Sequence, residues 1–138
     1  MMIRGRVLNP GSASGPVLVL EEPLSFWGGF DPKTGTIIDV RHPQRGGSLR
    51  GTVTLMRETR GSGTAPGAIA EAIRLGTAPC ALLLIEPDVN VAIGAAVAQV
   101  LYGRTCAVLA LDRDCYEALA RASSATVAED GVLTAALR

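Results

Sequence analysis

The sequence lacks an excess of charge of either sign, because its 138 residues carry 13 lysines and arginines against 13 aspartates and glutamates. Without a net positive field the chain has no long-range attraction for polyanions, so we expect no nucleic acid among its partners. It also lacks any run approaching the about 20 apolar residues of a membrane span, and no apolar core follows the charges at its start. We therefore expect a cytoplasmic protein that does not bind membranes.

Metal-binding side chains are scarce too. Cys80, Cys106 and Cys115 form no Cys-x-x-Cys pair, and His42 is the only histidine. An odd number of cysteines without a secretion signal argues against a disulfide framework. Cys80 and Cys106 each begin an apolar run, where cysteine behaves as a small buried hydrophobic residue. We expect reduced thiols and no metal or other cofactor bound by this chain.

What the sequence does contain is a series of short apolar segments, which we interpret as a single domain over residues 1–138. Strands are predicted at residues 3–8, 15–20, 36–40, 51–56, 81–85, 107–111, 126–128 and 132–136. Helices are predicted at residues 66–75, 91–101 and 114–122. Gly76 and Gly103 end the first two helices, Asp112 or Asp114 caps the third, and Asp130-Gly131 marks a hairpin.

The order of these segments predicts an α/β fold. Strands and helices alternate after residue 51, which is typical of a parallel or mixed sheet with flanking helices, and the N-terminal strands supply a second, barrel-like layer. The apolar strands at residues 15–20, 81–85 and 107–111 should have both faces covered. Residues 20–51 form a long glycine-rich loop that contains Phe26, Trp27 and Phe30, and long ordered loops are usually functional.

A glycine-rich turn joins a predicted strand to the first predicted helix and reads Arg60-Gly61-Ser62-Gly63-Thr64-Ala65-Pro66. Such a turn presents backbone N–H groups beside the positive end of a helix, which is an anion-binding arrangement. The N–H groups, with Arg57 or Arg60 nearby, would favour the alkoxide of Ser62. The same residues also fit a plain turn in which Ser62 caps the helix. The turn is neither a Walker A loop nor a Gly-x-Ser-x-Gly elbow.

A second motif is more distinctive, because residues 25–39 read Ser-Phe-Trp-Gly-Gly-Phe-Asp-Pro-Lys-Thr-Gly-Thr-Ile-Ile-Asp. Together with His42-Pro43 and the Arg60–Gly63 turn, this segment resembles the small subunit of the aconitase X family. The resemblance covers roughly residues 5–87. One departure is that the family commonly has serines after the first Gly-Ser, whereas Gly63 and Thr64 stand here.

The resemblance implies a swivelling β/β/α domain similar to the fourth domain of aconitase. It also implies a large partner subunit in a heterodimer or higher assembly, with an iron or iron–sulfur centre on that partner and none here. The implied reaction is elimination of water from a small hydroxy acid, in which a base removes the proton beside the carboxylate while iron acts on the departing hydroxyl. Ser62 aligns with the serine taken as the catalytic base.

Under this interpretation the substrate-binding set is Gly61, Gly63, Thr64, Arg60 and His42. A lone histidine in a loop is also typical of a structural or surface residue, and an arginine at a strand end of a solvated charge. Arg57 is an alternative to Arg60 for the substrate carboxylate. Asp31 and Asp39 flank a predicted turn and are interpreted as structural. Trp27, Phe26 and Phe30 either wall the substrate cleft or, as we expect, pack against the large subunit.

Two reactions are known in the family, and the predicted one is dehydration of cis-3-hydroxy-L-proline to a pyrroline carboxylate, since nothing outside the Ser62 turn is devoted to a phosphate. Dehydration of a phosphorylated mevalonate is the alternative. Two readings from other classes remain: a non-catalytic module that binds anions at the same helix N-terminus, and a homodimer built on the aromatic loop.

Overall fold

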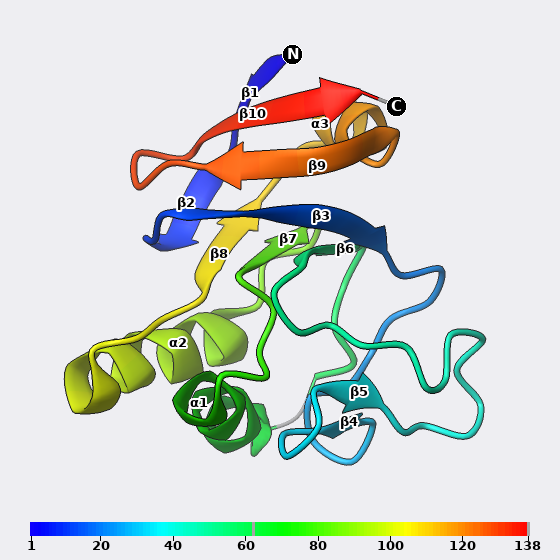
Figure 1. Cartoon of the computed structure of the whole chain (residues 1–138), viewed down its shortest axis with the longest axis vertical. Coiled ribbons are helices and arrows are strands. Elements are labelled where there is room, and N and C mark those ends of the chain that lie inside the picture. Colours follow the sequence, from blue (N-terminus) through cyan, green and yellow to red (C-terminus); the bar gives the residue numbers. More distant parts are fainter. Residues whose placement is uncertain (62, 138) are drawn as a thin grey trace.

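The computed structural model describes residues 1–61 and 63–137, which form a curled sheet at one end, with two helices and a long loop at the other (Figure 1). The strands are β1 (Met2–Arg4), β2 (Arg6–Asn9), β3 (Ala13–Val19), β4 (Phe30–Asp31), β5 (Thr36–Ile37), β6 (Val53–Met56), β7 (Ala81–Leu84), β8 (Ala107–Ala110), β9 (Ala122–Val127) and β10 (Val132–Leu137). The helices are α1 (Ala65–Leu75), α2 (Val89–Tyr102) and α3 (Arg113–Leu119).

Eight strands form one mixed sheet in the order β1-β10-β9-β3-β6-β7-β8-β2. The two outermost strands follow each other in the chain, with Gly5 between them, so the sheet curls into a nearly closed barrel. The prediction of a single strand over residues 3–8 is therefore wrong. Gly5 separates β1, which pairs with β10, from β2, which pairs with β8. A Cβ atom at Gly5 would lie 2.9 Å from the side chains of Leu109 and Leu111.

The middle of the sheet, β3-β6-β7-β8, is parallel and separates two cores. Leu82 and Leu84 of β7 pack in a cluster with α1 and α2, whereas Leu83 packs in a cluster with α3 and β9. Strand β3, on the other side of β6, has the same arrangement, because Leu18 packs against the first cluster and Val17 against the second. The prediction that these strands have both faces covered is confirmed.

The helix ends follow their local sequence signals. Gly76 ends α1 and Gly103 ends α2 in the left-handed conformation, with φ of 77° and 67°. Asp112, one of the two predicted caps, begins α3, and its carboxylate accepts a hydrogen bond from the Cys115 N–H at 2.7 Å. In the part of the chain that the structure describes, no helix is long and apolar enough to span a bilayer.

Three predicted boundaries need correction. The second helix begins at Val89 rather than residue 91, because Asp88 caps it. The third helix ends at Leu119, and Ala122, predicted as its last residue, begins β9 and is buried there. The strand predicted at residues 36–40 is only β5, because the chain turns away at Asp39, whose carboxylate accepts a hydrogen bond from the Arg41 N–H at 3.0 Å.

Helices α1 and α2 pack closely at Gly94. A Cβ atom at Gly94 would lie 2.2 Å from Cγ2 of Ile69 and 2.6 Å from the carbonyl oxygen of Pro66. Both distances are shorter than real Cβ contacts, and one of them is to backbone, so any larger residue here would have to displace α1. The exposed Gly67 of α1 is the opposite case, because a Cβ there would meet nothing within 4 Å.

These two glycines give a matched test of helix packing. Gly94→Ala should lower the free energy of unfolding by about 1–3 kcal/mol, because the added methyl group forces the helices apart. Gly67→Ala should raise it by up to about 1 kcal/mol, because alanine favours the helical backbone. Urea unfolding of both variants measures the difference, and a Gly94→Ala variant as stable as the unmodified chain would contradict the close packing.

Candidate functional site

Two loops leave the sheet at one edge because they follow neighbouring parallel strands. The aromatic loop (residues 20–52) follows β3, and the Ser62 turn (residues 60–64) comes shortly after β6. Pairing continues beyond the strands, since Leu24 and Thr59 form a parallel bridge and the Arg60 N–H donates to the Leu24 carbonyl oxygen at 3.2 Å. The aromatic loop is thereby held beside the turn.

A cavity of about 620 Å³ lies between the aromatic loop and the first turn of α1. It is lined by Phe26, Trp27, Gly28, Phe30, Asp31, Pro32, Ile38, Thr64, Gly67 and Ala68. Mostly apolar walls with a few polar groups are typical of small-molecule sites. None of these lining residues is a lysine, arginine or histidine, and Asp31 supplies the one carboxylate among them.

The predicted catalytic base, Ser62, lies outside the described residues. Thr64 lines the cavity and precedes α1 as its N-cap residue. Gly61 and Gly63 are exposed, and a Cβ atom at either would meet open space. Arg60 is exposed and is not among the lining residues. The structure thus places one of the five predicted binding residues, Thr64, in the cavity wall at the positive, N-terminal end of α1.

A hydrogen bond that the sequence analysis did not predict holds the segment before the Ser62 turn against the start of α2. The Thr59 hydroxyl donates a hydrogen bond to one carboxylate oxygen of Asp88. The other oxygen accepts from the backbone N–H groups of Asn90 and Val91, at 2.8 and 3.4 Å, which caps α2. Asp88 therefore ties the start of α2 to the segment that leads into the turn. An aspartate before a helix signals a cap, but no sequence pattern identifies its second partner.

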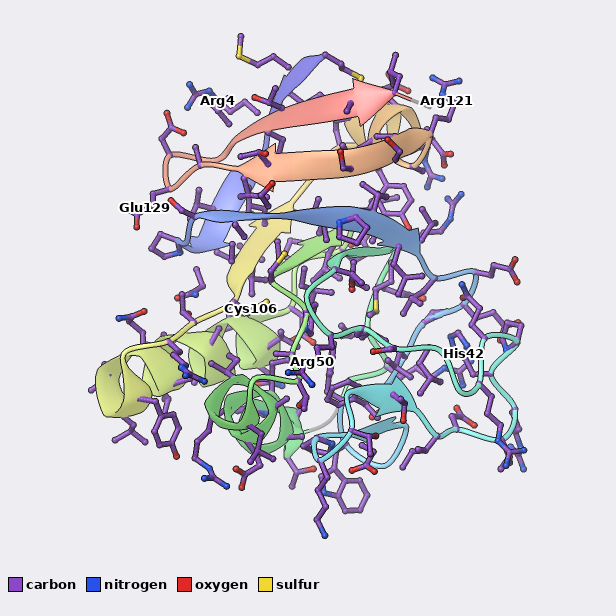
Figure 2. The ribbon with its side chains drawn as sticks, viewed as in Figure 1. Arg4, His42, Arg50, Cys106, Arg121 and Glu129 are labelled. Atoms are coloured by element: carbon purple, nitrogen blue, oxygen red, sulfur yellow. The ribbon has the colours of Figure 1, made fainter. Side chains whose placement is uncertain are left out.

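His42 is buried within the aromatic loop and lies away from α1 (Figure 2). Its Nδ1 accepts a hydrogen bond from the Gln44 N–H at 3.1 Å, which leaves Nε2 to donate to the Glu22 carbonyl oxygen at 3.0 Å. Both ring nitrogens thus hold the loop together. His42 does not line the cavity, and its role in substrate binding stays a prediction.

The other charged candidates have structural partners. Arg57 forms a 2.8 Å ion pair with Glu117 and lies over the ring of Tyr116, outside the cavity lining. Asp31 caps its turn as predicted, because its carboxylate accepts from the Lys33 N–H at 2.9 Å. Arg57 is therefore a weaker choice than Arg60 for a substrate carboxylate.

The aromatic residues divide into two groups. Phe26 and Phe30 are buried, pack edge to face with ring centroids 5.3 Å apart and belong to the core cluster with α1. The prediction that they pack against another subunit is therefore wrong for these two, because the chain itself covers them. Trp27 is 60% exposed at the cavity, and its contact with a partner stays a prediction.

Burial keeps the thiols of Cys80 and Cys106 in their protonated, unreactive form. Cys106 is fully buried between β8 and α2, and this burial raises the pKa of its thiol far above the usual range. Burial also raises the pKa of the half-buried Cys80. Among the described residues, no three His, Cys, Asp or Glu side chains come close enough to hold a metal ion. These residues do not fit the iron or iron–sulfur centre that the family resemblance implies.

The hydrogen bonds of His42 lead to a stability prediction. His42→Ala should lower the free energy of unfolding by about 1–3 kcal/mol, because it leaves buried backbone groups of the aromatic loop without partners. Chemical denaturation of the isolated chain measures this effect. An unchanged unfolding midpoint would show that the ring does not support the loop and would return His42 to the candidate substrate contacts.

Comparison with known proteins finds relatives of two kinds. A cis-3-hydroxy-L-proline dehydratase from Pseudomonas aeruginosa is 44% identical over 80% of this chain, but the match covers only 19% of that enzyme. The phosphomevalonate dehydratase small subunit from Methanothermobacter thermautotrophicus is 41% identical over 72% of this chain and 76% of its own length. The chain thus spans about a fifth of the first relative and most of the second.

Solved structures and family models agree with these relatives. The crystal structure of Thermococcus kodakaraensis aconitase X in its holo form superposes with a TM-score of 0.80, at 26% identity, over 98% of both chains. This superposition confirms the swivelling fold that the sequence resemblance implied. The family model described as the aconitase X swivel domain matches residues 2–135. The chain belongs to the aconitase X swivel domain family.

Proposed function

We propose that this chain is the small, swivelling-domain subunit of an aconitase X-type hydro-lyase, and that it supplies the proton acceptor for dehydration of a hydroxy acid. The observation that carries the proposal is the cavity between the aromatic loop and the first turn of α1, immediately beside the Ser62 turn. The proposal is also supported by the relatives, which include a cis-3-hydroxy-L-proline dehydratase and a phosphomevalonate dehydratase small subunit.

Ser62 is proposed to accept the proton beside the substrate carboxylate. A serine hydroxyl does this only if its surroundings favour the alkoxide, and the positive end of α1 with the N–H groups of Gly63 and Thr64 would do so. The exposed Arg60 is the proposed partner of the substrate carboxylate. The family resemblance assigns the iron or iron–sulfur centre to the large subunit, and the described residues of this chain offer no group of three metal-binding side chains.

The proposed substrate is cis-3-hydroxy-L-proline. Loss of the C2 proton and of the C3 hydroxyl as water gives an enamine, which tautomerises to a pyrroline-2-carboxylate. The cavity lining favours this substrate over phosphomevalonate, because it has no cationic side chain for a phosphate and has the Asp31 carboxylate for the ring ammonium group. The 41% identity to the methanogen small subunit keeps phosphomevalonate as the alternative.

Replacement of the base tests the catalytic role. In the assembly with the large subunit, Ser62→Ala should lower kcat by roughly 100- to 10,000-fold while the two subunits still associate. Exchange of the C2 proton with deuterated solvent, followed by NMR, should be lost in parallel, because this exchange reports proton removal separately from hydroxyl departure. The matched control is Ser12→Ala, at an exposed serine outside the cavity lining. Normal turnover by Ser62→Ala would refute the base assignment and favour an anion-binding module.

Substrate choice is tested separately. The assembled enzyme should show a kcat/KM at least about 100-fold higher for cis-3-hydroxy-L-proline than for the phosphorylated mevalonate, since Arg60 is proposed to pair with the carboxylate and the cavity lining offers no further cationic side chain for a phosphate. Trans-4-hydroxy-L-proline is the negative control, because its hydroxyl is not adjacent to the carbon that loses the proton. The reverse preference would identify the enzyme as a phosphomevalonate dehydratase.

A further inference from the structure

Helix α2 carries a strip of exposed apolar residues on its outer face in addition to its buried inner face, and the only amide side chains among its exposed residues are Asn90 and Gln99. Its 14 residues include no charged side chain. The inner face buries Val91, Gly94, Ala95 and Ala98, among others, in the contact with α1 and the sheet. Helices of a soluble domain normally carry polar residues on the outer face, and a helix that is apolar all round is normally buried all round. Something outside this chain therefore covers α2.

The outer face forms one continuous strip. Its members are Val89, Ile93, Ala96, Val97, Val100 and Leu101, which recur at helical spacing. Val100 is 84% exposed and Leu101 is 63% exposed. Two shallow grooves of about 310 and 200 Å³ share Ile93 and Ala96, so the strip is hollowed along its length. Contiguous apolar strips of this kind mark interaction sites.

The size of the strip and the charge of α2 distinguish three candidates that could cover it: a second copy of this chain, a membrane surface and a larger protein. A stable dimer buries about 800 Å² on each partner, and α2 alone offers only one narrow strip of six residues, so a second copy packed on α2 alone is insufficient. A membrane surface is also a poor fit, because interfacial helices carry lysine and arginine beside the apolar face and α2 has neither. A larger protein that extends beyond α2 meets the area requirement.

The position of α2 points to the same partner as the cavity. Helix α2 and the aromatic loop both lie at the end of the molecule opposite the two termini, with α1 between them (Figure 1). The cavity adds the exposed side chains of Trp27 and Ile38. Together with the strip they extend the exposed apolar surface beyond α2, as a stable interface requires.

We propose that the outer face of α2 is the docking surface for the large subunit, which covers this strip and closes the cavity in one contact. The proposal rests on the proposed function, because it presupposes that subunit. The Pseudomonas relative agrees with it, since the region matched by this chain is only 19% of that protein and the remainder is available to cover an apolar helix.

The test compares two leucines of equal exposure. Leu101 in α2 and Leu137 in β10, at the opposite end of the molecule, are each 63% exposed. Leu101→Glu and Ile93→Glu should weaken binding of the full chain to the aconitase X-type large subunit at least about 100-fold, because a carboxylate would be buried without a partner. Leu137→Glu should bind normally. Calorimetric titration measures affinity, and thermal unfolding shows that each variant is folded.

Each other outcome has a definite meaning. Normal binding of the large subunit by both α2 variants overturns the docking surface and leaves the proposed function standing. A dimer of the isolated chain that Leu101→Glu dissociates overturns it in favour of a second copy. Failure of the unmodified chain to bind the large subunit overturns the docking surface and the proposed function together.

Discussion

Parallel pairing of β3 with β6 is the constraint on which the candidate site depends. Two strands that run in the same direction must release their following loops at the same edge, so the aromatic loop and the Ser62 turn become neighbours on either side of β6 in the chain. The bridge between Leu24 and Thr59 carries the pairing past the sheet. The cavity is thus a product of sheet topology, and the loop sequences only shape its walls.

Local signals predicted most of the fold because their causes are local. Gly76 ends a helix because only glycine adopts the left-handed conformation without strain, and Asp112 begins one because its carboxylate accepts a nearby N–H. The interruption between β1 and β2 at Gly5 has a cause that is not local. Both halves of residues 3–8 have strand sequences, and the break exists because their partners, β10 and β8, are different strands brought in from distant parts of the chain.

The candidate site was predictable in its motifs but not in its contacts. The composition of the aromatic loop is the same whether Phe26 and Phe30 face inward or outward, and their packing into the core with α1 decides the matter. The link between Thr59 and Asp88 joins residues 29 positions apart, which no helical or strand spacing relates. Buried hydrogen bonds fix His42 inside the loop for the same reason: its partners are backbone groups, which leave no trace in a sequence.

Close packing inside the molecule also explains why its outer surface is incomplete. Gly94, Ala95 and Ala98 let α2 approach α1, and small residues on the inner face leave the larger aliphatic side chains of the helix on the outer face. This distribution is the reverse of that in a free-standing domain, where the larger apolar residues face the core. It is what we expect of a helix that the proposed large subunit covers in the assembly. The cavity beside the Ser62 turn is open to solvent, and the aromatic loop and α1 that line it lie at the same end of the molecule as α2 (Figure 1). One partner surface that covers the helix would therefore also exclude water from the site, so that assembly and formation of the active site become the same event.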